Sequence, residues 1–239
     1  MDASRFLAQW DRQIADWCVD DLMRDGTEAV LLQPLARWKW AAVQLVEHAS
    51  ASADYRQRKA AAILAGFVDD PPTSLLDDLF ERESERNALA EPETTEPLCC
   101  QSVVEDAVLA AARWCRKDTS RPAGLALLRK VVERTLVGEY WSAATYAMAT
   151  LCRHRAADVD ALLQSFLTFA QGSPPSHPTS PTLATERGFA RRLMAGQSEA
   201  LEAVEAVLDR QEEASRDVHL DPEAQAMVDE WFGLAARIG

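Results

Sequence analysis

The residue types that carry acid–base and nucleophilic chemistry are sparse in this sequence of 239 residues. Its four histidines are far apart, and none lies in a motif whose spacing is typical of a nucleophile and its base. They are His48, His154, His177 and His219. We therefore expect no catalytic residue and interpret each histidine as an ordinary surface side chain.

The sequence also lacks the patterns that hold metals or phosphates. It contains no Cys-x-x-Cys, no histidines at positions i and i+4, and no Glu-x-x-His, and its nine glycines are scattered. The adjacent Cys99 and Cys100 could react with soft metals or oxidants, but a place at a helix N-terminus explains them equally well. We expect no metal and no cofactor.

The charge of the chain favours some partners over others. The net charge is −13, which disfavours nucleic acid as a partner because an acidic surface repels phosphate. Residues 113–155 are the exception, with nine basic and three acidic residues. No apolar run approaches the ~20 residues that cross a bilayer, and the N-terminus does not resemble a signal peptide. We expect a cytoplasmic protein without a membrane segment.

The hydrophobic pattern predicts an all-α protein. Apolar residues recur every three or four positions, and strictly alternating β-branched segments are absent. The clearest pattern covers residues 102–170 and predicts four helices joined by short loops. Ala-rich helices followed by Leu-rich helices resemble the antiparallel pairs of HEAT-type solenoids, although no consensus motif is shared. We expect either an irregular α-solenoid or an irregular helical bundle.

Polar and proline-rich stretches divide the chain. Residues 1–170 are predicted to form the main helical domain, with a loop near residues 88–99. Residues 171–182 hold four prolines among serines and threonines and are predicted to be a linker. Residues 183–239 are predicted to form C-terminal helices that pack on the same domain.

Three groups of residues are candidates for binding another protein. Arg113, Arg116 and Lys117 form a basic face, which could be solvated, or could dock an acidic partner or the acidic ends of this chain. Trp38 and Trp40 lie on different faces of one helix, so one of them is a candidate interface anchor. Around Glu199, Glu202 and Glu205 an acidic helix could face solvent or a basic partner.

These features favour a non-catalytic protein-binding module. An immunity or inhibitor protein that neutralises a bacterial toxin, by binding its basic domain, is the specific candidate. The alternatives are an enzyme that uses helix-borne carboxylates and a nucleic-acid binder that uses the basic segment 113–155.

Overall fold

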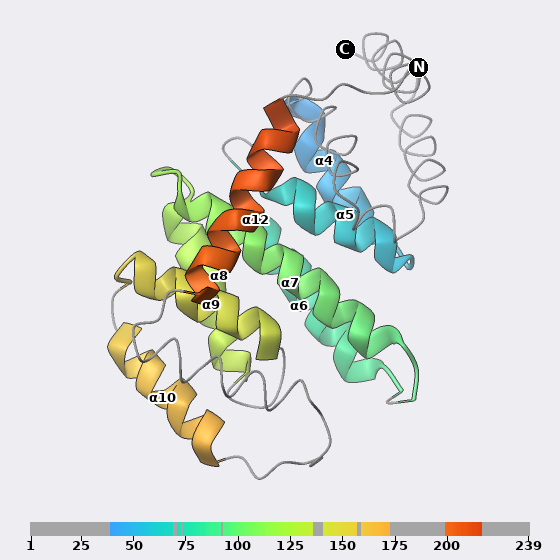
Figure 1. Ribbon diagram of the computed structural model, residues 1–239. Coiled ribbons are helices and arrows are strands. Elements are labelled where there is room, and N and C mark those ends of the chain that lie inside the picture. The colour runs from blue at the N-terminus through green and yellow to red at the C-terminus, as the bar shows by residue number, and fades with distance from the viewer. Residues whose placement is uncertain are drawn as a thin grey trace, which may run out of the picture.

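The computed structural model describes residues 39–68, 71–72, 74–91, 93–135, 141–156, 159–172 and 199–216. These residues form eight helices and no strand, which confirms the all-α prediction for this part of the chain (Figure 1). In chain order they are α4 (Lys39–Ser50), α5 (Tyr55–Ala65), α6 (Leu75–Leu89), α7 (Glu96–Cys115), α8 (Arg121–Thr135), α9 (Trp141–Arg153), α10 (Val159–Gly172) and α12 (Glu199–Arg216). None of these helices has the length and apolar character that crossing a membrane requires.

Helix α7 is the centre of this arrangement. It packs against α5, α6, α8, α9 and α12, and Figure 1 shows it as the long green helix. In a solenoid each repeat contacts only its neighbours along the chain. Helix α7 also contacts α12, which is remote in sequence, and the described helices pack together around α7; the HEAT-like solenoid is not established.

Small side chains let α5 approach α7 closely. Both helices bury several alanines completely, and a Cβ atom built on Gly66, at the end of α5, would lie 3.1 Å from the Cα atom of Ala110 in α7. Many alanines of this Ala-rich sequence thus lie where two helices contact each other. The fully buried alanines on the two helices are Ala60, Ala61, Ala62, Ala65, Ala107 and Ala111.

Helix α8 approaches α7 even more closely, at Gly124. A Cβ atom at this position would lie 2.7 Å from the carbonyl oxygen of Ala111 and 3.0 Å from Cys115 Sγ. We expect Gly124→Ala to lower the free energy of unfolding by about 1–3 kcal/mol, because the two helices must separate to admit the methyl group. Urea denaturation measures this change. An unchanged or increased stability, as helix propensity alone would give, would show that α7 and α8 are not in this close contact.

The helix boundaries differ from the predicted ones in two places. The loop expected near residues 88–99 spans only residues 90–95, because α6 continues to Leu89 and α7 begins at Glu96, with Pro97 in its first turn. Of the expected linker 171–182, residues 171–172 belong to α10, and the others lie outside the described residues. Of the segment 183–239 the structure describes α12, which packs on α7 and α9.

Candidate functional site

Arg113, predicted to lie on a basic face of α7, is covered by α12. Its side chain is only 5% exposed. The guanidinium donates hydrogen bonds to Glu212 Oε1 at 3.0 Å and to Gln211 Oε1 at 3.0 Å. It also donates to the backbone carbonyl of Leu208 at 3.1 Å. Arg113 is therefore an internal contact between helices and not a residue of a solvated patch.

Arg116, the residue directly after the end of α7, also binds α12. Its guanidinium forms ion pairs with Glu205, with Asp209 Oδ1 at 2.9 Å and with Glu212 Oε1 at 2.8 Å. Glu205, predicted to lie on an acidic surface for a partner, thus pairs within the chain. We name this contact the α12 clamp. Its basic residues are Arg113 and Arg116, at the end of α7, and Arg153 of α9, whose Nε atom lies 3.4 Å from Glu205 Oε1. Its acidic residues are Glu205, Asp209 and Glu212 of α12.

The other predicted binding residues are not among the residues that define the α12 clamp. Lys117 is half-buried just after the end of α7, and Glu202 is exposed on α12. Glu199 begins α12, but its side chain, like those of Trp38 and Trp40, lies outside the described residues. The interpretation of the two tryptophans as interface anchors therefore stays a prediction.

An aromatic ring outside α12 supports the clamp. The guanidinium carbon of Arg113 lies 4.0 Å from the centroid of the Phe67 ring, just beyond the end of α5. A cation over an aromatic face is attracted by the negative charge density of the ring, more strongly where water is excluded. Phe67 therefore helps to hold the Arg113 side chain in place.

A second ionic cluster, which the sequence analysis missed, is buried among α5, α6 and α7. The Arg58 side chain is 0% exposed and places its Nε atom 2.8 Å from Oε1 of Glu83, which is 1% exposed. Another nitrogen, Nη2, lies 2.5 Å from Glu96 Oε1, and Nη1 donates a hydrogen bond to the Ala53 carbonyl at 2.7 Å. We name this the Arg58 cluster. A signal for it does exist in the sequence, because the unbroken apolar run at residues 60–65 predicts a helix that is buried on all sides. The charged residues next to this run are then expected to be buried as well.

Burial in the Arg58 cluster affects the neighbouring cysteine. Burial raises the pKa of Glu83, against the opposing effect of the Arg58 charge. Burial and the nearby Glu83 carboxylate raise the pKa of the Cys100 thiol to about 12, and burial also raises the pKa of Cys99. Only a thiolate attacks or ligates efficiently. These thiols stay protonated at neutral pH, which argues against reactions of the Cys99–Cys100 pair with metals or oxidants.

A second buried ion pair connects α5 to α7. The Lys59 Nζ atom lies 2.6 Å from Asp106 Oδ2 and donates a hydrogen bond to Ser102 Oγ at 2.9 Å. Burial raises the pKa of Asp106, while the positive charge of Lys59 opposes this effect. The carboxylate is thus engaged by a cation. Among the described residues no group of three His, Cys, Asp or Glu side chains is placed to hold a metal ion.

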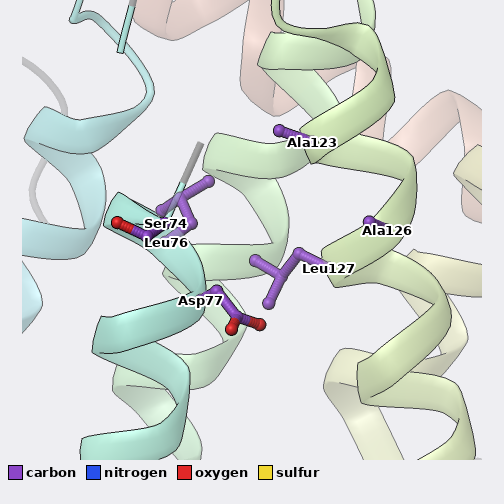
Figure 2. Close-up of a pocket in the computed structure, with 6 residues that line it drawn as sticks. All are labelled: Ser74, Leu76, Asp77, Ala123, Ala126 and Leu127. Atoms are coloured by element: carbon purple, nitrogen blue, oxygen red, sulfur yellow. The ribbon is translucent and has the colours of Figure 1, made fainter. Parts of the chain in front are cut away.

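A cavity of about 380 Å³ lies between the start of α6 and the start of α8. Figure 2 shows its lining, which is mostly apolar. The one carboxylate in the lining, Asp77, lies 2.7 Å from Nζ of Lys130 in α8. The lining thus offers no nucleophile with an oriented base. The lining residues are Ser74, Leu76, Asp77, Ala123, Ala126 and Leu127.

Two leucines are exposed where α6 ends and α7 begins. Leu89, the last residue of α6, is 85% exposed, and Leu98, in the first turn of α7, is 67% exposed. Exposed acids lie close to them in the chain, at Glu85, Glu91 and Glu93. We name residues 85–91 and 93–98 the α6–α7 tip. The sequence analysis missed this surface, because the two leucines lie at the ends of an expected polar loop and continue no apolar stripe.

Comparison with known protein families, with curated proteins and with solved structures finds no match to this chain.

Proposed function

We propose that this chain is a non-catalytic protein-binding module that binds a basic partner protein through the α6–α7 tip. The observation that carries the proposal is the exposure of Leu89 and Leu98, 85% and 67%, on one end of a helical hairpin. Removing apolar surface from water is favourable by about 25 cal/mol per Å². A partner that covers both leucines therefore gains binding free energy at this point.

The charges around the two leucines indicate the kind of partner. Protein interfaces commonly have an apolar centre and a polar rim. At the tip the rim is acidic, with exposed Glu85, Glu91 and Glu93, and the whole chain carries a net charge of −13. Complementary charge speeds association, so a basic protein is favoured. Neutralising a basic toxin domain in the cytoplasm, as an immunity or inhibitor protein does, is the specific role that fits this chemistry.

The two alternative functions have less support. At least six of the nine basic residues in 113–155 form ion pairs with acids of the chain, so this segment offers less positive charge to a phosphate backbone than its composition predicts. The buried carboxylates Glu83 and Asp106 are engaged by Arg58 and Lys59, which argues against their use as catalytic bases. The six paired bases are Arg113, Arg116, Arg121, Lys130, Arg134 and Arg153.

The experiment identifies a partner from the native lysate and then measures purified partner against variants of the full chain. We expect Leu89→Ser/Leu98→Ser to weaken binding at least tenfold, because both leucines lose their apolar contact. Since both side chains are exposed, the variant should keep the wild-type stability. If the partner binds this variant and the wild type equally well, the tip is not the contact surface.

A second pair of variants tests the charge of the rim. Glu91→Lys/Glu93→Lys should slow association at low salt, and the effect should shrink at high salt because ions screen the attraction. The matched control, Glu133→Lys/Asp160→Lys, changes the net charge equally at exposed positions outside the tip. Equal slowing by both pairs would assign the effect to net charge and contradict a binding role for the tip acids.

A further inference from the structure

Helix α12 is joined to the bundle by a contact of unusual composition. Among the side chains of α12 that the structure describes, the apolar ones that are fully buried are Val204 and Leu208, and they pack with Ala112 in a small cluster separate from the main core. The remainder of the contact is largely ionic and consists of the α12 clamp. The other helices of the bundle share one continuous core that does not include α12.

Groups outside α12 also contact or position the bundle side of this contact. The Phe67 ring supports Arg113, which carries its charge where α12 excludes water. Arg116 and Arg153 project from the C-terminal ends of α7 and α9, two helices fixed by the main core. We name this side the acceptor face; it consists of Arg113, Arg116, Arg153, Leu109, Ala112 and Tyr146.

The acceptor face recognises a definite pattern of side chains. Its arginines bind acids at positions 205, 209 and 212, and its apolar residues bind Val204 and Leu208. These positions repeat every three or four residues and so lie along one side of a helix. A helix with acids at i, i+4 and i+7, and apolar residues at i−1 and i+3, presents the same groups. The planar guanidinium group of arginine has paired N–H donors and is therefore well suited to bind carboxylates.

We propose that the acceptor face is a binding site for an acidic amphipathic helix of a partner protein, which binds there in place of α12. The positive charge of the acceptor face and its match to this one pattern of acids select the partner. A partially exposed ionic contact is screened by salt and is exchanged more readily than a continuous apolar core. The site is separate from the α6–α7 tip and does not depend on the function proposed for it.

The test uses a fluorescent synthetic peptide of residues 199–216 and the full chain. Glu205→Lys/Glu212→Lys repels α12 from the acceptor face, whereas Glu202→Lys/Glu213→Lys makes the same charge change at exposed positions of the same helix. We expect the first variant to bind the peptide at least tenfold more tightly than the wild type or the second variant. Raising the salt concentration should weaken this binding. Equal binding to all three chains would overturn the proposal.

Two further measurements keep the result decisive. Glu205→Gln/Glu212→Gln removes the ion pairs of these two acids without adding repulsion. Circular dichroism then compares this variant and Glu205→Lys/Glu212→Lys with the wild type. If both variants lose more helix than α12 contains, α12 is required by the fold and the proposal is wrong. An unrelated peptide sequence with the same spacing of acids and apolar residues should bind as tightly as the 199–216 peptide. If only the peptide of this chain binds, the face serves α12 alone, and the proposal of a partner helix fails.

Discussion

Replacing Arg58 with methionine is expected to lower the free energy of unfolding by about 3–5 kcal/mol. The substitution keeps an apolar stem of similar length but removes the cation that lies 2.8 Å from Glu83 Oε1. Glu83 is 1% exposed, so its carboxylate cannot recover hydration in place of the lost partner. The hydrogen bond to the Ala53 carbonyl is lost as well. Guanidinium denaturation at neutral pH measures the change.

The pH dependence of this loss identifies its cause. Burial already raises the pKa of Glu83, and removing the Arg58 charge, which opposes that effect, should raise it further. A carboxyl whose pKa is higher in the folded state stabilises the fold below its unfolded pKa, and this stability is lost as the pH rises through the folded value. The loss caused by Arg58→Met should therefore be smaller at pH 5 than at pH 8. The control Arg58→Met/Glu83→Leu, which removes both charges, should recover much of the stability. A loss below about 1 kcal/mol in the single variant, independent of pH, would contradict the buried ion pair.

Trp114→Ala is expected to cost about 3–5 kcal/mol of unfolding free energy. Trp114 is 0% exposed near the end of α7, and its removal leaves a large cavity at the centre of the bundle. Its Nε1 atom also donates a hydrogen bond to the carbonyl oxygen of Ala65 at 2.8 Å. Ala65 is the last residue of α5, where carbonyls have no partner within the helix.

Trp114→Phe separates the two contributions. Phenylalanine retains most of the apolar volume but cannot donate to Ala65, so we expect a smaller loss than for alanine. Thermal unfolding followed by circular dichroism gives both values. Equal losses for the two variants would assign the whole effect to the hydrogen bond, and no loss for alanine would place Trp114 outside the core.

The helices were predictable from the sequence because each needs only a local pattern. The four helices expected over residues 102–170 correspond to α7, α8, α9 and α10. Their arrangement was not predictable, since periodicity shows which face of a helix is buried but not which helix covers it. The central place of α7 depends on contacts with α5 and α12, which no spacing within 102–170 contains.

The same limit explains why the candidate sites were only partly predictable from the sequence. From the sequence, Arg113, Arg116 and Glu205 were selected as charged binding residues, and docking on the acidic ends of this chain was one alternative for the arginines, but nothing paired the arginines with Glu205. The ion pair between Arg116 and Glu205 joins residues 89 positions apart, and a local pattern carries no information about such a pair. Leu89 and Leu98 were missed for the opposite reason, because their exposure follows from the absence of any neighbour that covers them.

The close approach of α5 and α7 limits how the sequence can vary over evolution. A Cβ atom added at Gly66 would crowd Ala110. The alanines of both helices that are fully buried leave equally little room for an added methylene group, because protein interiors are closely packed. Only residues as small as glycine, alanine or serine fit such positions without moving a helix. The exposed side chains of α12 have no such packing limit. Descendants of this sequence can therefore diverge more freely at those side chains while keeping a stripe of small residues along α5 and α7.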